Sequence, residues 1–177
     1  MFDLIAFIGL FLGGIFLTSK QAGSALPSTN DALPQPYSVN KNDLDVMART
    51  IWGEARNEGY AGMQAVANVI MNRYSLAQRS NAYARQFGST PAEICKKPWQ
   101  FSVWNAGDPN LEKIINVTDA NREFRTAKSI AELALRGQLA DVTGGADHYH
   151  AHYVAPNWSQ GENPTAVIKN HQFYKLA

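Results

Sequence analysis

The chain has 177 residues, of which 45% are hydrophobic and 18% are charged, and its formal net charge is +1. This composition is typical of a globular protein with one buried core, and it excludes a largely disordered chain. The near-neutral charge gives no basic surface for nucleic acid, and the single cysteine, Cys95, excludes an intramolecular disulfide and a thiolate zinc cluster.

The N-terminal region differs in character from the rest of the chain. Residues 4–17 form an almost unbroken apolar run, shorter than the about 20 residues of a typical membrane span. The run fits a signal peptide cleaved after Ala25, and it fits equally an uncleaved anchor, because Asp3 is the only charged side chain before it. We therefore expect a signal or membrane-anchor segment at 1–20, a proline-containing linker at 21–39, and one folded domain at 40–177. That domain would act in the periplasm or cell wall, either exported or held on the inner membrane by the N-terminal segment.

The first predicted helix of the domain carries a glutamate on its buried face. An apolar stripe at helical spacing runs along residues 42–56, and one turn further it reaches Glu54. The stripe consists of Leu44, Met47, Ala48 and Ile51. Burial penalises an ionised carboxylate and raises its pKa, so Glu54 can hold a proton near neutral pH, as a general acid must. The alternative is a partly exposed glutamate near the helix end, paired with Arg49 or Arg56.

Capping signals and apolar stripes predict the remaining helices. Asn42 or Asp43 is expected to cap the helix that carries the glutamate. A second stripe predicts a core helix over residues 61–74. The Thr-Pro-Ala-Glu capping box at residues 90–93 opens a brief helix. The last helix is predicted over residues 119–136, and a glycine follows it as the terminating residue.

Two later segments alternate polar and apolar residues, which is the pattern of short strands. They are residues 99–104 and residues 148–154, and residues 166–174 are expected to form a further short strand or a loop. Together these elements predict an α+β domain that is mostly helical, with a small antiparallel sheet near the C-terminal half.

The first of these strands offers groups that suit a sugar. Gln100 and Ser102 lie on one face of a strand over residues 99–104. Amide and hydroxyl groups beside exposed tryptophans suit sugar binding, because an indole face stacks on the apolar face of a pyranose ring. The alternative is that Trp99 and Trp104 belong to the core.

Three histidines alternate along the second predicted strand. His148, His150 and His152 would share one side of it, a geometry that can chelate zinc. Three neutral imidazoles with an open fourth position activate water. The alternative is a polar, aromatic strand that lines a cleft. His171 can join either arrangement.

A glycosidase with two carboxylates needs a partner for Glu54. The candidates are Glu58, Asp147 and Glu162, and surface solvation is the ordinary state of each. A mechanism with a single carboxylate needs no such partner.

These residues stand in the order found in a known family. Residues 48–56 (ARTIWGEAR) and 65–73 (AVANVIMNR) resemble the opening of the cell wall hydrolases of the SleB/CwlJ, or spore-cortex-lytic, type. Residues 100–102 (QFS) resemble the central segment of that family. Residues 144–151 (GGADHYHA), then Trp158 and residues 168–173, resemble its C-terminal part.

The resemblance implies a compact lysozyme-like or resuscitation-factor-like fold and a lytic transglycosylase activity on the glycan strands of peptidoglycan. It implies that Glu54 is the catalytic acid and base at the bond between N-acetylmuramic acid and N-acetylglucosamine. The product would carry a 1,6-anhydro end, and the reaction needs no cofactor. The expected substrate-binding residues are Trp52, Trp99, Gln100, Ser102, Tyr149, His150, Trp158 and His171.

Two other functions are compatible with the sequence. A zinc-dependent N-acetylmuramoyl-L-alanine amidase would use His148, His150 and His152 to cut the peptide from muramic acid. A non-catalytic peptidoglycan-binding module would keep the sugar contacts alone. Both a bacterial envelope enzyme and a phage lysis protein with an export anchor fit the chain.

Overall fold

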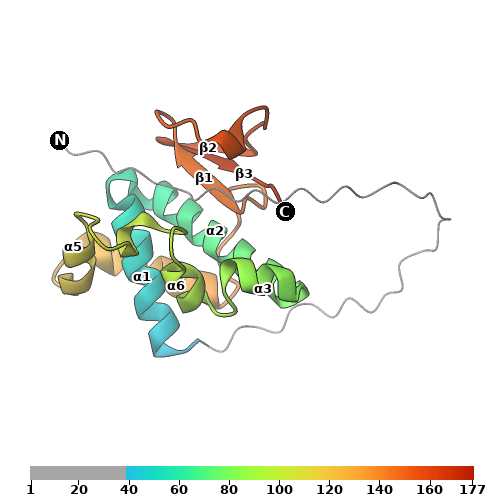
Figure 1. Cartoon of the computed structure of the whole chain (residues 1–177). Helices are drawn as coiled ribbons and strands as arrows, with labels where there is room; N and C mark the ends of the chain where they lie inside the picture. The colour runs from blue at the N-terminus through green and yellow to red at the C-terminus, as the bar shows by residue number, and fades with distance from the viewer. Residues whose placement is uncertain (1–38) are drawn as a thin grey trace.

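The computed structural model describes residues 39–177, so the predicted N-terminal segment and its linker, except for residue 39, lie outside the described residues. The described elements are, in chain order, α1 Lys41–Ala55, η1 Arg56–Glu58, α2 Gly59–Arg79, α3 Asn81–Phe87, α4 Pro91–Lys96, η2 Ser102–Trp104, α5 Leu111–Asn116, α6 Arg122–Leu135, β1 His148–Ala151, η3 Asn157–Ser159, β2 Ala166–Ile168 and β3 His171–Tyr174. The sheet lies on one side of a helical body, beside α2 (Figure 1). This arrangement confirms the predicted α+β class, mostly helical with a small antiparallel sheet. Among residues 39–177, no helix combines the length and apolar character that a membrane crossing requires.

Helix α1 forms the centre of the helical body and packs against α6, α2, α4 and α5. Its predicted stripe is confirmed, since Met47, Ala48 and Ile51 are fully buried. The predicted cap is wrong: the side chain of Asn40, not of Asn42 or Asp43, accepts a hydrogen bond in the first turn, from the Asp43 N–H at 2.8 Å. The carboxylate of Asp43 is buried and accepts a hydrogen bond from the Ala92 N–H at 2.8 Å, which joins α1 to the start of α4.

The three other predicted helices are present as α2, α4 and α6, whereas α3 and α5 were not predicted. Helix α2 extends beyond the predicted residues 61–74 at both ends. At the start of α4, the hydroxyl of Thr90 accepts a hydrogen bond from the Glu93 N–H, as the capping box predicts. Helix α6 ends at Leu135, and Gly137 follows with a φ of +69°, a left-handed conformation that favours glycine after a helix.

The sheet has the strand order β1-β3-β2, with both pairs antiparallel. The strand predicted over residues 148–154 ends at Ala151, and the final segment supplies two strands instead of one. In the β1–β3 register, Tyr149 lies opposite Phe173 and His150 lies opposite Gln172. Successive side chains of a strand point to opposite faces. The inner face therefore carries Tyr149 and Phe173, which belong to the main core, and the outer face carries His150.

The strand predicted over residues 99–104 is wrong. We call residues 97–110, between α4 and α5, the connecting segment; it consists of turns and the short helix η2. The backbone of Trp99 is left-handed, with a φ of +67°, which is incompatible with a continuing strand. The alternation of polar and apolar residues has another cause: the apolar side chains of Phe101 and Val103 lie in the core, and the polar side chain of Ser102 between them faces Glu54.

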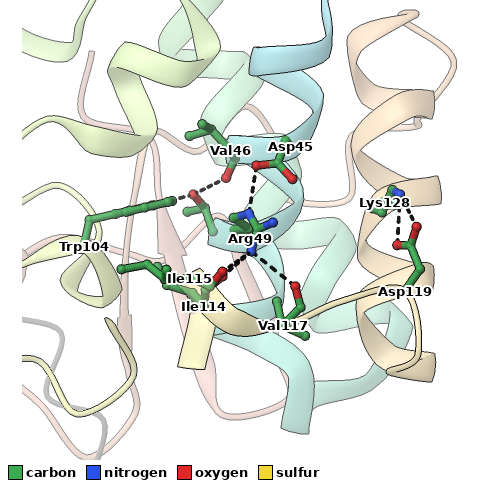
Figure 2. A network of polar contacts seen from close by, with 10 residues as sticks. Asp45, Val46, Arg49, Trp104, Ile114, Ile115, Val117, Asp119 and Lys128 are labelled. Carbon is green, nitrogen blue, oxygen red and sulfur yellow. Dashed lines mark hydrogen bonds and ion pairs between the residues drawn. The ribbon is translucent and has the colours of Figure 1, made fainter. Parts of the chain in front are cut away.

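Close packing and one arginine hold the end of this region against α1. Figure 2 shows Arg49 on α1, whose Nη1 donates to the carbonyl oxygens of Ile114 and Ile115 at 2.5 and 3.0 Å, in the last turn of α5. At Gly53 an added Cβ would stand 2.7 Å from the Ile114 side chain and 2.9 Å from that of Val103. Glycine at this position therefore lets the connecting segment reach the last turn of α1.

Candidate active site

The carboxyl group of Glu54 lies buried in the last turn of α1, where the side chain is only 3% exposed. Its Oε2 accepts a hydrogen bond from the hydroxyl of Tyr149 at 2.9 Å. Its Oε1 accepts from the backbone N–H of Val103 at 3.2 Å and, more weakly, from the hydroxyl of Ser102 at 3.5 Å. The apolar stripe of α1 thus buries the acid, and its hydrogen-bond donors come from β1 and the connecting segment.

The pKa of Glu54 is raised above the ordinary value of 4.5. Burial is the largest cause, because the ionised carboxylate loses its water. The hydrogen bonds from Val103, Tyr149 and Ser102 lower the pKa, whereas the negative charge of Asp108 raises it. Burial outweighs the donors, so the site favours the protonated acid and still holds three donors for the anion.

Asp108 is the functional candidate that sequence reasoning missed. It lies in the connecting segment, partly buried, and its Oδ1 accepts a hydrogen bond from the Asn110 N–H at 2.7 Å. The side chain of Asn110 in turn accepts from Arg56 at 2.8 Å. Asp108 interacts electrostatically with both Glu54 and Arg56. No periodic pattern joins positions 54 and 108; only the path of the connecting segment brings them together.

The acids named from the sequence are engaged elsewhere. Both carboxylate oxygens of Glu58 accept hydrogen bonds from Asn170, at 3.1 Å from its backbone and 3.0 Å from its side chain. Asp147 is fully buried, pairs with His148 and accepts the backbone N–H groups of the last two residues of the chain. Glu162 is exposed in the loop before β2.

The two tryptophans expected to stack on sugars differ in access. Trp99 is 60% exposed, and its left-handed backbone is held by a hydrogen bond from its N–H to the side chain of Asn105 at 3.3 Å. Trp52 is only 7% exposed; the guanidinium of Arg56 covers its ring at 4.6 Å and its Nε1 donates to Asn121. Of this pair, Trp99 alone offers an open face, and Gln100 is half-buried beside it.

The sheet divides the remaining predicted site residues between its two faces. On the inner face, His171 packs edge-on against Tyr149, with 5.3 Å between ring centroids. The Nδ1 of His171 is buried without a hydrogen-bond partner among the described residues, and burial lowers the pKa of this imidazole. On the outer face, the ring of Trp158 covers His150 and Tyr174, at 5.5 and 5.4 Å between centroids. His150 and Trp158 therefore lie across the sheet from the Glu54 carboxyl.

The three histidines do not form the predicted row. His152 lies beyond the end of β1 and is exposed, so it does not share a strand face with His148 and His150. His148 Nδ1 pairs with Asp147 at 2.5 Å, and His150 Nε2 is 3.0 Å from the hydroxyl of Tyr174. Within residues 39–177 no group of three or more histidine, cysteine or acidic side chains is placed to hold a metal ion.

Comparison with known sequences relates this chain to proteins that degrade the cell wall. The sequence model of the Cell Wall Hydrolase family matches residues 57–174, a range that begins just after Glu54. The spore cortex-lytic enzyme of Halalkalibacterium halodurans is 32% identical over 114 residues, which are 64% of this chain and 28% of that protein. The spore cortex-lytic enzyme of Oceanobacillus iheyensis is 45% identical over 65 residues, 37% of this chain and 22% of that protein. The chain thus spans less than a third of the length of these relatives.

Two solved structures share the fold. The catalytic domain of the Bacillus cereus SleB protein is 30% identical, with a TM-score of 0.60, over 85% of this chain and 100% of that one. The catalytic domain of the germination-specific lytic transglycosylase SleB from Bacillus anthracis is 28% identical, with a TM-score of 0.59, over 81% of this chain and 100% of that one.

Proposed function

We infer the function from two findings: the chain belongs to the cell wall hydrolase family, and Glu54 is a buried acid held by three donors. The protein cleaves peptidoglycan glycan strands between N-acetylmuramic acid and N-acetylglucosamine, as a lytic transglycosylase. Residues 40–177 form the catalytic domain. The observation that carries the proposal is the burial of the Glu54 carboxyl group among three donors, because burial raises its pKa and favours the protonated form that a general acid needs.

In the first step, Glu54 donates its proton to the glycosidic oxygen. The bond from this oxygen to C1 of muramic acid breaks, and the sugar at C1 acquires oxocarbenium character. The carboxylate left behind is anionic in a buried place. The hydroxyls of Tyr149 and Ser102 and the N–H of Val103 then stabilise the anion, because hydrogen bonds to a charged acceptor are stronger than those to a neutral one.

In the second step, the Glu54 carboxylate removes the proton from the C6 hydroxyl of the same muramic acid. The C6 oxygen attacks C1, which forms the 1,6-anhydro ring and regenerates the protonated acid. This reaction consumes no water and requires no second carboxylate. Hydrolysis would instead require a base for water, and Asp108 is the described acid with an electrostatic influence on Glu54.

Substrate binding is proposed for Trp99, Gln100 and His171, which lie beside the donors in sequence or in space. The open indole face of Trp99 stacks on a sugar ring, and Gln100 beside it supplies an amide for hydroxyl or acetamido groups. Ser102 and Tyr149 act on the substrate through Glu54. His171 presents beside Tyr149 a buried nitrogen that has no hydrogen-bond partner among the described residues and that suits a bound hydroxyl or water.

For the N-terminal segment, we propose export to the wall or attachment to the inner membrane. The apolar run at residues 4–17 supports this, together with a wall polymer as substrate. Deleting residues 1–25 is expected to leave activity on isolated sacculi intact and to abolish delivery to the periplasm. A truncated protein that still reaches the wall in cells would contradict the proposal.

The test of the function is mass spectrometry of the soluble products that residues 40–177 release from purified peptidoglycan. Anhydro-muropeptides, with activity insensitive to EDTA, are the expected result. Reducing-end muropeptides would mean hydrolysis and would make Asp108 the first residue to replace. Released peptides with intact glycan would mean an amidase, and a folded domain that binds glycan without releasing products would be a binding module.

A further inference from the structure

Arg73 is a charged side chain in the middle of the core. It lies on α2 and is 0% exposed. Its guanidinium is held between two aromatic rings, with its carbon 5.3 Å from the centroid of Phe87 and 5.1 Å from that of Phe101. Its Nε donates to the backbone carbonyl of Asp147 at 2.7 Å, and its Nη1 is buried with no hydrogen-bond partner within residues 39–177.

Burying a cation in the core costs free energy, because the charge loses its water. No ion pair joins Arg73 to a carboxylate within residues 39–177. Burial lowers the pKa of Arg73 to about 10, which still leaves it charged at neutral pH. A buried charge without a paired partner normally destabilises a fold, because the ion loses its hydration. The arginine thus keeps a positive charge that the resting protein does not neutralise with an ion pair.

The contacts of Arg73 lie directly behind the residues that hold Glu54. Phe101 immediately precedes Ser102, and its ring packs on that of Tyr149 with 6.4 Å between centroids. The Asp147 carbonyl that accepts the hydrogen bond from Arg73 directly precedes β1, two residues before Tyr149. Arg73 interacts electrostatically with Tyr149 first, then with Asp147 and Cys95, and most weakly with Glu54 itself.

We propose that Arg73 is a positioning residue whose buried charge stabilises the anionic form of Glu54 between its two proton transfers, acting through Tyr149. While Glu54 is protonated, the charge of Arg73 is compensated only through space, chiefly by the buried carboxylate of Asp147, with which it forms no ion pair. When Glu54 gives up its proton, the new anion compensates the arginine, and the polarised Tyr149 hydroxyl donates more strongly to Oε2. The inference rests on the proposed acid and base role of Glu54.

The other groups that influence Glu54 cannot replace this charge. Asp108 from the connecting segment is itself negative and opposes the anion. Arg56 from η1 is partly exposed and already donates to the Gly53 carbonyl and to Asn110. Cys95 from α4 is buried, and burial raises the pKa of its thiol to about 12, which keeps it neutral. Among the described residues near Glu54, Arg73 is the fully buried cation.

The experiment is a ¹³C NMR titration of the Glu54 carboxyl in residues 40–177, beside the pH profile of glycan cleavage. Arg73→Met keeps much of the apolar stem and removes the charge. It is expected to move the Glu54 titration, and with it the basic limb of the pH profile, upward by about 1 pH unit. Arg73→Lys is expected to restore both. Phe87→Leu is the control, because it loosens the packing around the guanidinium while the charge stays; it should lower thermal stability without moving either titration.

Three outcomes would overturn the proposal. In the first, the Glu54 carboxyl group of folded Arg73→Met titrates at the same pH as in the wild type, which would mean that Arg73 has only a structural role. Another is a folded Arg73→Lys that titrates like the methionine variant. The third applies if the methionine variant does not fold: Arg73→Gln, which keeps a donor for the Asp147 carbonyl, then replaces it, and an unshifted Glu54 titration in this variant would overturn the proposal. Loss of the proposed function would be recognised separately, by full activity of Glu54→Gln.

Discussion

The helical body and the connecting segment contribute different properties to the same carboxyl group. Helix α1 places Glu54 on its buried face, and burial raises the pKa of the carboxyl group because the ionised form loses its water. The connecting segment has little regular backbone bonding, which leaves the Val103 N–H and the Ser102 hydroxyl free to donate to Glu54. Helix α1 therefore favours the protonated form of Glu54, whereas the connecting segment and β1 supply the hydrogen bonds that stabilise its anionic form.

The burial half of this comparison can be tested through stability. Because the folded state holds the Glu54 proton above pH 4.5 and the unfolded chain does not, wild-type stability falls as pH rises from 4.5 toward the folded pKa. Glu54→Gln lacks this loss. We expect the free energy of unfolding of Glu54→Gln to gain on wild type by about 1.4 kcal/mol per pH unit over that interval. Urea unfolding at several pH values measures it; a constant difference would mean that Glu54 titrates like an exposed acid.

The donor half is tested by two tyrosines of the same sheet. Tyr149→Phe removes the hydroxyl that donates to Glu54, and a lost hydrogen bond to a charged group costs about 1.5–3 kcal/mol. Activity is therefore expected to fall about 10- to 100-fold. Tyr174→Phe is the matched control, since its hydroxyl meets His150 on the outer face. Equal losses in the two variants would show that the outer face also serves the reaction.

The attachment of α5, at the end of the connecting segment, to α1 is tested at Arg49. Arg49→Met removes the donor to the carbonyls of Ile114 and Ile115 and is expected to cost about 1.5 kcal/mol of stability. Lys128→Met breaks an ion pair with Asp119 that is exposed on both sides, at a cost of at most about 0.5 kcal/mol (Figure 2). Chemical unfolding of both variants gives the comparison. Similar costs would mean that α5 is held by apolar packing alone.

The smallest effect is expected at the exposed edge of the connecting segment. Trp99→Ala should raise KM for soluble glycan about tenfold with little change in kcat, because a stacking contact on a remote ring is lost. Trp99→Phe should recover most of the affinity. Since the side chain is 60% exposed, thermal stability should change little. A fall in kcat with an unchanged KM would place Trp99 in the positioning of Glu54 rather than in sugar binding.

The same contrast explains what the sequence predicted and what it did not. The stripe on α1 led to a buried Glu54 because a helix has a fixed period, and the Thr90 box and the glycine after α6 are local signals. Residues 99–104 were predicted as a strand because polar and apolar residues alternate in the sequence, but the backbone turns here and Phe101, Ser102 and Val103 are all buried. The left-handed backbone at Trp99 could not be predicted, because tryptophan has no preference for that conformation.

Long-range contacts and strand faces set the other limits. Asp108 was not predicted, because its nearness to Glu54 depends on the packing of Val103 and Ile114 over Gly53. Tyr149 and His150 were both expected in the sugar site, although adjacent residues of one strand point to opposite faces. The structure brings the first to Glu54 and the second to Tyr174.

The measurement that tests the central claim most directly compares wild-type residues 40–177 with Glu54→Gln on purified peptidoglycan, by mass spectrometry of the released products. Glutamine keeps the shape of the side chain and cannot donate the proton. We expect anhydro-muropeptides from the wild type and a loss of at least about 100-fold in their rate of release by a folded Glu54→Gln. Anhydro-muropeptides released by both proteins at similar rates would contradict the role of Glu54 as the acid and base.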